Sequence, residues 1–356
     1  MQKSRLFYRL DEKMMKIKLL VASSDNGYAE DLTKTLSEKH SDIFETSVCT
    51  TRKLFYDTLE RQKFDTALIE PHFISEKPDL TSILLPLLLW SDCEPLTDSD
   101  SATPLKKISK YQRISSLTSE VIEHYSGVSP VGCEISTKKT QIAAFWSPAG
   151  GVGTTTASLA YAASQVSDSR QVLYLNLESF ASTPVYFAEG GKSISAAFEM
   201  LENNNGNVSM LIRGLRKHDV SSGVAYFLHP DNYDDMNILS AEDAAEMISA
   251  CCAIADQLVI DISCICNRRT WQIFALADKI FIVTDRSKTA QQKLSQFTSQ
   301  HNVFQRIKTK TTFIANKDAT IRGFPAESII SLPFITTADE SEVYKPLSEG
   351  FHGETA

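Results

Sequence analysis

A glycine-rich stretch in the middle of the chain has the residue types of a phosphate-binding loop. Residues 147–156 read S-P-A-G-G-V-G-T-T-T, between an apolar segment and an alanine-rich one. Glycines let main-chain N–H groups point inward around a phosphate, and a helix that begins there adds its dipole. Such loops normally carry a lysine directly after the last glycine, but here that position is Thr154. The stretch therefore suggests phosphate binding without the usual cation, and a turn without a ligand is the alternative.

Hydroxyl and main-chain groups of the loop are the candidate ligands. We expect Thr155 to bind Mg²⁺ and Thr156 to reach the α-phosphate of a nucleotide. The residues expected to contact the nucleotide are Ala149, Gly150, Gly151, Val152, Gly153, Thr154, Thr155 and Thr156.

Apolar runs and amphipathic segments alternate along the whole chain. Predicted strands are 16–22, 44–49, 64–70, 84–90, 141–147, 171–178, 223–229, 257–263, 278–285 and 310–316. Predicted helices are an amphipathic segment around 28–36, then 51–61, 111–125, 155–166, 194–202, 208–217, 241–255, 269–276 and 287–302. This alternation predicts an α/β protein with parallel sheets that carry helices on both faces.

A polar segment with proline and glycine divides the chain. Residues 128–140 read as a linker between a domain at 14–127 and a larger one at 141–356, and residues 1–13 read as an extension.

Composition excludes some classes of function. The net charge of −8 argues against broad attraction to nucleic acid or anionic lipid, and no run is long enough for an integral membrane segment. The seven cysteines lack framework spacing, which indicates reduced and mostly buried thiols in a cytoplasmic protein. We expect Cys264 and Cys266 to be packing residues; the alternative is a metallo-redox enzyme with bridging cysteines.

The larger domain resembles the MinD/ParA ATPases over about residues 141–350. Their loop reads K-G-G-x-G-K-T-T, and A-G-G-V-G-T-T-T occupies the same places here. The family's signature lysine corresponds to Ala149, its ordinary loop lysine to Thr154, and the preceding glycine to Pro148. The resemblance implies a doubly wound P-loop fold that binds ATP and Mg²⁺.

Three downstream segments extend this resemblance. It implies that Asp261, in L-V-I-D-I-S, holds Mg²⁺ through water, and that Glu178, in L-Y-L-N-L-E, lies near the attacking water. Asn176 replaces the first of the family's two acids on that strand. Asn316 takes the place of the asparagine that recognises adenine, and S-L-P-F-I at 331–335 resembles the closing strand.

The smaller domain resembles a response-regulator receiver, which implies a flavodoxin-like parallel sheet. Glu70 stands where the phosphorylated aspartate would be. The acidic pair after the first strand has become Ser23 and Ser24, with Asp25 still acidic, whereas Ser91 and Lys110 match the family. Without the acidic cluster we expect no Mg²⁺-assisted phosphorylation, and we expect a docking module instead.

A degenerate receiver joined to a MinD-like domain resembles the TadZ/CpaE pilus assembly proteins. This resemblance implies an ATP-binding homodimer that localises or assembles Tad-type pili. Slow or absent hydrolysis is expected because the cations that stabilise phosphoryl transfer are missing. Pilus or secretion components would recruit the protein to the cell pole or the inner membrane face.

Two alternatives stay open. One is an active ATPase that uses other cations, such as Arg268, Arg269 or Lys317. The other is a receiver-type signalling protein that binds no nucleotide.

Overall fold

The computed structural model describes residues 16–351, with breaks at 42, 77, 92–104, 130–138, 188–192, 204–205 and 338. The chain divides into two compact units, Met1–Val128 and Ser129–Ala356. Each unit alternates strands with helices around a mainly parallel sheet, which confirms the predicted α/β class. The predicted extension 1–13 and most of the predicted linker 128–140 lie outside the described residues.

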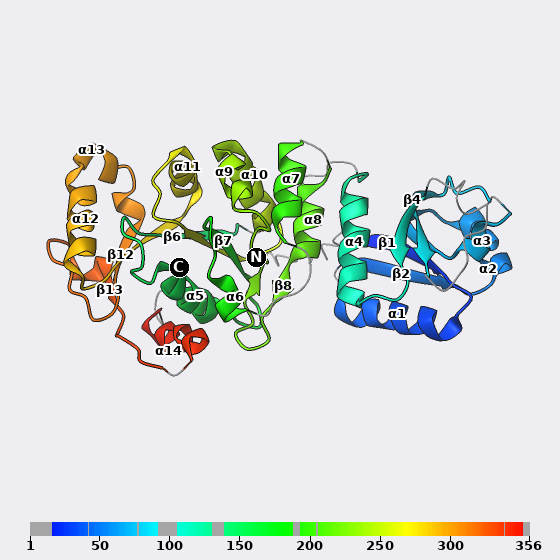
Figure 1. Cartoon of the computed structure of the whole chain (residues 1–356), viewed down its shortest axis with the longest axis horizontal. Helices are drawn as coiled ribbons and strands as arrows, with labels where there is room; N and C mark the ends of the chain where they lie inside the picture. The colour runs from blue at the N-terminus through cyan, green and yellow to red at the C-terminus, as the bar shows by residue number, and fades with distance from the viewer. Residues whose placement is uncertain are drawn as a thin grey trace, which may run out of the picture. The chain divides into compact units, whose positions relative to one another are not determined.

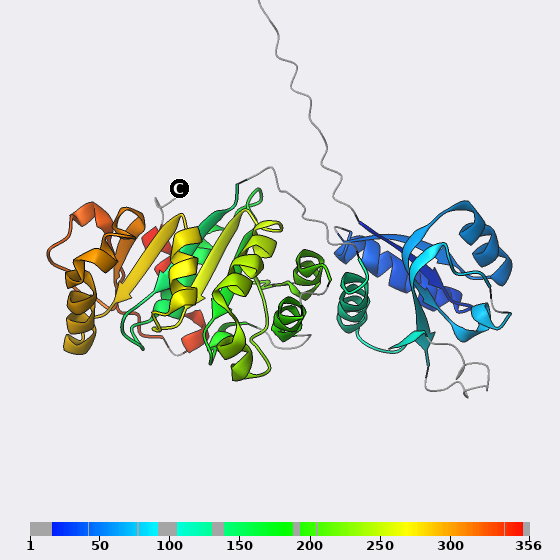
Figure 2. The same cartoon turned by 90° about the horizontal axis from the view of Figure 1, so that it is seen from above.

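The N-terminal unit is built on one parallel sheet (Figures 1 and 2). Its strands are β1 (Ile17–Ala22), β2 (Phe44–Cys49), β3 (Phe64–Ile69), β4 (Ile83–Trp90) and β5 (Lys106–Ser109). They lie in the order β2-β1-β3-β4-β5, which is the flavodoxin-like order. Its helices are α1 (Asn26–Lys39), α2 (Arg52–Arg61), α3 (Pro71–Ile74) and α4 (Ile114–Ser126).

The C-terminal unit has a larger sheet in the order β13-β12-β11-β6-β10-β7-β9-β8. Its strands are β6 (Gln141–Trp146), β7 (Val172–Leu177), β8 (Lys217–His218), β9 (Ala225–Tyr226), β10 (Gln257–Ile262), β11 (Lys279–Thr284), β12 (Thr311–Ala315) and β13 (Ile329–Ser331). Neighbouring strands are parallel except β8 and β9, which are antiparallel. The glycine-rich loop comes directly after β6, an interior strand of this sheet.

Helices cover both faces of this sheet (Figure 1). On one face lie α5 (Thr154–Gln165) and α14 (Tyr344–Leu347). On the other lie α7 (Ser195–Glu202), α8 (Val208–Leu215), α10 (Ala241–Cys252), α11 (Arg268–Leu276) and α12 (Lys288–Ser299). Shorter helices are α6 (Thr183–Tyr186), α9 (Tyr233–Ile238) and α13 (His301–Phe304), and 3₁₀ turns lie at Lys308–Lys310, Ala326–Ser328, Glu340–Glu342 and Ser348–Phe351.

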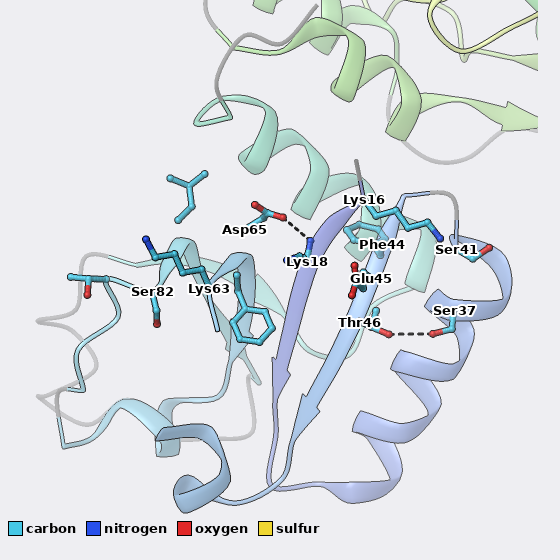
Figure 3. A pocket seen from close by; sticks show the side chains of 13 residues that line it. Lys16, Lys18, Ser37, Ser41, Phe44, Glu45, Thr46, Lys63, Asp65 and Ser82 are labelled. Carbon is cyan, nitrogen blue, oxygen red and sulfur yellow. Dashed lines mark hydrogen bonds between the residues drawn. The ribbon is translucent and has the colours of Figure 1, made fainter. Parts of the chain in front are cut away.

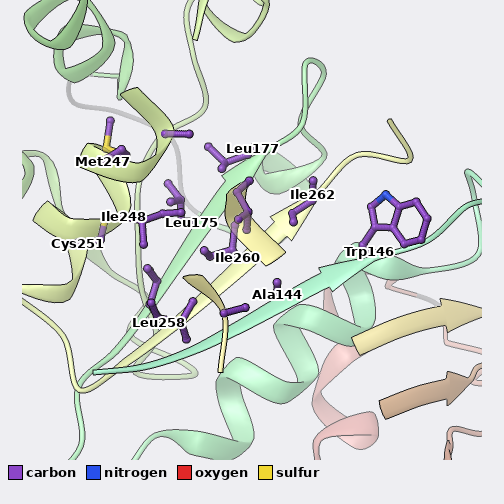
Figure 4. Packing of buried hydrophobic residues seen from close by; sticks show 14 of the residues in the cluster. Ala144, Trp146, Leu175, Leu177, Met247, Ile248, Cys251, Leu258, Ile260 and Ile262 are labelled. Carbon is purple, nitrogen blue, oxygen red and sulfur yellow. The ribbon is translucent and has the colours of Figure 1, made fainter. Parts of the chain in front are cut away.

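Side chains of the central strands alternate between two hydrophobic cores. Leu175 and Leu177 of β7 face α10, where they pack with Ile248 in the core drawn in Figure 4. Tyr174 belongs to the other core, on the side of α5. Since side chains along a strand alternate in direction, the polar positions two and four residues beyond Tyr174 also lie on the α5 side.

The structure differs from the expected elements in a few places. The strand expected at 223–229 is reduced to β9, because beyond Tyr226 the segment pairs only through an isolated bridge between Leu228 and Ser193. The closing strand lies at Ile329–Ser331 rather than at 331–335. The short elements α3, β5, α6, β8, α9, α13 and α14 were not expected, because so few residues show no clear periodicity.

The burial of two cysteines differs from the burial expected from the sequence. Cys49 and Cys251 are buried and Cys252 is half-buried. Cys264 and Cys266 are exposed, so the expectation that they are packing residues is wrong. They lie just beyond the end of β10 in a surface loop, where spacing along the chain carries no information on burial.

Candidate nucleotide site

The glycine-rich loop has backbone conformations that favour glycine. Gly151 has φ +76° and Gly153 has φ +89°, and Gly153 directly precedes the first residue of α5. A Cβ atom added to Gly153 would lie 2.4 Å from Nδ2 of Asn316. Gly153 is therefore required both by its left-handed backbone and by the close approach of Asn316.

Two residues just beyond β12 hold the carbonyl side of this loop. Nδ2 of Asn316 donates to the carbonyl oxygen of Val152 at 2.8 Å. Nζ of Lys317 donates to the carbonyl oxygen of Gly151 at 3.1 Å and lies 3.7 Å from a carboxylate oxygen of Asp285. Because the N–H and C=O of a trans peptide point in opposite directions, these contacts leave the N–H side of the loop for a ligand.

The side-chain amide of Asn316, which is predicted to recognise adenine, already makes hydrogen bonds within the protein. Its side chain is 3% exposed, and its Oδ1 accepts from the main-chain N–H of Lys317 at 2.9 Å. Both ends of the amide are thus engaged. Contact with a base stays a prediction, and it would require one of these bonds to be exchanged.

Two of the expected contact residues point away from the loop's open side. Ala149 and Val152 are 6% and 2% exposed and belong to the core on the α5 side. The N–H of Ala149 donates to the hydroxyl of Ser147 at 3.0 Å. A contact of Ala149 with phosphate, through side chain or main chain, would therefore require a rearrangement.

A buried carboxylate lies at the end of β10, next to β7. Asp261 is fully buried and pairs in register with Asn176 across the two strands. Its Oδ2 accepts from the hydroxyl of Tyr174 at 2.7 Å and from Nδ2 of Asn176 at 3.3 Å. Its Oδ1 is buried and has no hydrogen-bond partner within the described residues. A buried carboxylate oxygen without a partner is costly, and a bound cation would satisfy it.

The second acidic residue connects this carboxylate to the loop. Oε2 of Glu178 accepts from the hydroxyl of Thr155 at 3.3 Å and from Nδ2 of Asn176 at 3.3 Å. The hydroxyl of Thr156 lies 3.4 Å from that of Tyr186 in α6. The structure thus brings together Thr155, Glu178 and Asp261 at the carboxyl ends of parallel strands, where open α/β sheets bind ligands. Their roles toward Mg²⁺ and water stay predictions.

The electrostatics of this cluster favour a cation. Burial raises the pKa of Asp261 to about 7, and the Glu178 carboxylate acts in the same direction, while nearby hydroxyls, that of Thr155 first, lower it. Within the described residues, no ion pair neutralises either carboxylate. Mg²⁺ prefers oxygen ligands of this kind, so the Thr155 hydroxyl and the Asp261 carboxylate fit a magnesium ion.

Tyr174 is the member of this cluster that the sequence reasoning missed. It reaches Asp261 because β7 and β10 are neighbours. The signal was present in V-L-Y-L-N-L-E, where Tyr174, Asn176 and Glu178 alternate with leucines. A period of two places all three side chains on one face of a strand.

The three cationic side chains considered as replacements for the loop lysines differ in whether they contact the loop. Arg268 pairs with Glu242 at 2.6 Å on the surface. Arg269 donates to the carbonyl oxygens of Met236 and Leu239, at the end of α9. Both arginines therefore serve other contacts. Lys317 does touch the loop, but on its carbonyl side.

The N-terminal unit has a second polar cluster around Glu70, the residue directly after β3. Oε1 of Glu70 accepts from Nζ of Lys110 at 2.8 Å and from the hydroxyl of Ser23 at 2.6 Å. Oε2 accepts from the N–H of Ser24 at 2.8 Å and from its hydroxyl at 2.9 Å. Burial acts to raise the pKa of Glu70, but these bonds outweigh it and hold the pKa below its usual value. Both oxygens are thus saturated by groups of the chain itself.

A separate hollow of about 1050 Å³ lies at the amino-terminal end of the same sheet (Figure 3). Its rim carries Lys16, Lys18, Lys63 and the acidic Asp65, whose carboxylate accepts from the main-chain N–H of Lys18 at 2.8 Å. Glu70 lies beyond the opposite, carboxyl-terminal end of β3. The hollow is lined by mostly exposed side chains and shares no residue with the Glu70 cluster, so we assign no ligand to it.

Comparison with solved structures finds similar folds for part of the chain. A ParA family ATPase from Chlorobium tepidum TLS is 16% identical, with 61% of this chain and 92% of that chain covered and a TM-score of 0.46. A plasmid partition protein from Borrelia burgdorferi is 15% identical, with 61% and 100% covered and a TM-score of 0.45. The septum site-determining protein MinD of Pyrococcus horikoshii OT3, complexed with Mg-ADP, is 15% identical, with 60% and 92% covered and a TM-score of 0.44.

The sequence itself matches no family model and no curated protein. Among the described residues, no helix has the length and apolar character needed to cross a bilayer. A shared ligand does not follow from such low identities, so the choice of ligand depends on the geometry of this chain.

Proposed function

We propose that the C-terminal unit binds MgATP and that the chain is a nucleotide-bound homodimeric localisation or assembly factor with slow or absent hydrolysis. The observation that carries the proposal is the buried Oδ1 of Asp261, which has no partner within the described residues and lies in the same cluster as the Thr155 hydroxyl. A glycine-rich turn alone does not imply a bound phosphate. A glycine-rich turn beside a buried carboxylate oxygen without a partner favours binding of a cation together with an anion.

The chain's own groups would divide the work of binding. The N–H groups of residues 150–156 and the dipole of α5 would hold the phosphates. Thr155 and Asp261 would hold Mg²⁺. The bound ion would offset the negative charge of the phosphates and of the Asp261 and Glu178 carboxylates. Glu178 would orient water, although its Oε2 already accepts two hydrogen bonds.

Slow turnover is expected from the groups that the loop lacks. Thr154 and Ala149 carry no charge, and Lys317 is held on the carbonyl side of the loop. Loss of a group that stabilises transition-state charge typically lowers the rate by about 10²–10³-fold, whereas main-chain donors still support binding. We therefore propose a site that holds its nucleotide.

The role in Tad-type pili is the finer part of the proposal. Support for it comes from the union of a receiver-like unit, whose Glu70 is saturated by Lys110, Ser23 and Ser24, with a lysine-free phosphate loop. We propose that the N-terminal unit docks onto pilus or secretion components, which recruit the protein from the cytoplasm to the cell pole or inner membrane face. A fluorescently tagged chain should gather at the pole only in cells that express those components, and uniform fluorescence would contradict this role.

Calorimetric titration of the full chain with MgATP tests the binding proposal. We expect binding by the wild type and at least about 10-fold weaker Mg²⁺-dependent binding by Thr155→Val, which removes only the hydroxyl. Thr35→Val, in α1 of the N-terminal unit, is the matched control and should bind as the wild type does. Folded wild-type protein that binds no MgATP would remove the proposal, and rapid phosphate release would replace a holding site by a working ATPase.

A further inference from the structure

The side chain of Tyr174 is buried in the hydrophobic core on the α5 side of the C-terminal sheet. Tyr174 is 1% exposed, and its ring contacts that of Phe187 with centroids 6.0 Å apart. Its hydroxyl donates to Oδ2 of Asp261 at 2.7 Å, the shortest hydrogen bond that this carboxylate accepts within the described residues. A tyrosine hydroxyl ordinarily ionises only at about pH 10, so at neutral pH it keeps its proton and remains a donor.

The two oxygens of Asp261 are treated unequally. Tyr174 and Asn176 both donate to Oδ2, whereas Oδ1 has no partner within the described residues. An aspartate side chain turns only about χ1 and χ2, so hydrogen bonds that hold one carboxylate oxygen restrict where the other can point. The two donors from β7 therefore decide which oxygen is left for a ligand, and in which direction it points.

We propose that Tyr174 is a positioning residue for the metal ion: its hydroxyl fixes Oδ2 of Asp261 and thereby presents Oδ1 to Mg²⁺. This inference rests on the proposed MgATP site. Hydrogen-bond partners of a metal ligand fix its orientation, and their loss typically weakens metal binding by about 10–100-fold. Asn176 acts on the same oxygen with a longer bond, so its effect is the smaller of the two.

Packing alone does not account for the hydroxyl. A phenylalanine ring would fill the same space beside Phe187, and a buried hydroxyl is costly unless it is hydrogen-bonded. The ring serves the core and the hydroxyl serves Asp261. Tyr174→Phe separates the two, because it keeps the ring and removes only the donor.

The test measures ATP affinity of the full chain as a function of Mg²⁺ concentration, with a parallel measurement in EDTA. Tyr174→Phe should raise the Mg²⁺ concentration at the midpoint by about 10-fold or more and leave affinity in EDTA unchanged. Tyr344→Phe is the matched control, since Tyr344 is a 2% exposed tyrosine of the same hydrophobic core, and it should match the wild type. Thermal unfolding in EDTA checks that each variant is folded.

The outcomes separate this inference from the function on which it rests. A wild-type chain that binds no ATP at any Mg²⁺ concentration overturns both. If the wild type binds and Tyr174→Phe has the same Mg²⁺ midpoint, positioning is wrong while the nucleotide site stands. Equal loss of affinity with and without Mg²⁺ shows a structural role and also overturns it. If Tyr174→Phe fails to fold, Asn176→Ala replaces it, with a shift of the same sign expected.

Discussion

Two buried acidic residues of this chain lie in opposite electrostatic environments. Glu70 receives a lysine, two hydroxyls and a main-chain N–H, which together lower its pKa despite burial. Asp261 receives a hydroxyl and an amide, and burial raises its pKa to about 7. Groups of the chain itself satisfy the Glu70 carboxylate, whereas an added cation would stabilise the ionised form of Asp261.

Asp261→Asn should stabilise the protein without nucleotide by about 1–2 kcal/mol at pH 8. Because the folded-state pKa of Asp261 is raised to about 7, protonated Asp261 contributes to the stability of the wild type at low pH. This contribution is lost as the pH rises through about 7. The difference between variant and wild type should therefore grow between pH 5 and pH 8. Urea unfolding at several pH values measures it, and a variant less stable than the wild type at pH 8 would contradict the prediction.

Glu70→Gln should destabilise the N-terminal unit by about 2–4 kcal/mol, because it removes the nearer of the two carboxylates paired with the buried ammonium of Lys110 and leaves only Asp25, 3.6 Å away. Because the pKa of Glu70 is lowered, its contribution to stability changes with pH in the opposite direction to that of Asp261. Its contribution is present above the usual carboxyl pKa, about 4, and is lost as pH falls below it. Unfolding curves at several pH values measure the stability of Glu70→Gln. Glu60→Gln, at an exposed residue of α2, is the control. Equal stability of the two variants would count against a role for the ion pair.

At the scale of elements, the site depends on residues at the carboxyl ends of four parallel strands. The loop comes after β6, Glu178 after β7 and Asn316 after β12, while Asp261 lies near the end of β10. Asn316 and Lys317 close the carbonyl side of the loop, so β12 supports the turn between β6 and α5. The loop is thereby formed by contacts within the protein, before any ligand is added.

Two glycines of the loop provide a matched comparison of this support. Gly153→Ala should lower stability by about 2 kcal/mol or more and abolish nucleotide binding, because φ is +89° and Cβ would meet Asn316 at 2.4 Å. Gly150→Ala has open space within 4 Å and no left-handed backbone, so it should fold and bind. Thermal unfolding and calorimetry measure both, and similar behaviour of the two variants would show that Asn316 does not constrain the loop.

At the scale of the whole molecule, we expect a homodimer that forms without a lysine at the signature position. Ala149, at the signature position, is buried in the core, so a substituted lysine there would have to leave it. The segment 178–187 instead offers exposed apolar side chains, with Phe180 81% exposed and stacked on Tyr233. We therefore expect these side chains to contribute to the dimer.

Sedimentation should find a homodimer that changes only modestly between no nucleotide, ADP and ATP. Phe180→Ser should weaken it by about 10-fold or more, since burial of an aromatic ring contributes about 1.5–3 kcal/mol. Tyr111→Ser, at an exposed aromatic residue of the N-terminal unit, is the control. A monomer under all three conditions would contradict the proposed homodimer. A dimer found only with ATP would show that another residue senses the γ-phosphate.

The sequence by itself determined the α/β class, most strand and helix positions, and the turn between β6 and α5. These are local properties, because periodicity of apolar residues and the conformational freedom of glycine act over a few neighbouring residues. Only the tertiary structure decided that Tyr174 binds Asp261, that Ala149 is buried and that Cys264 and Cys266 are exposed. Contact between positions 174 and 261 requires β7 and β10 to be neighbours in one register, and burial depends on which elements cover a residue. Packing of distant segments sets both, and no window of the sequence contains that information.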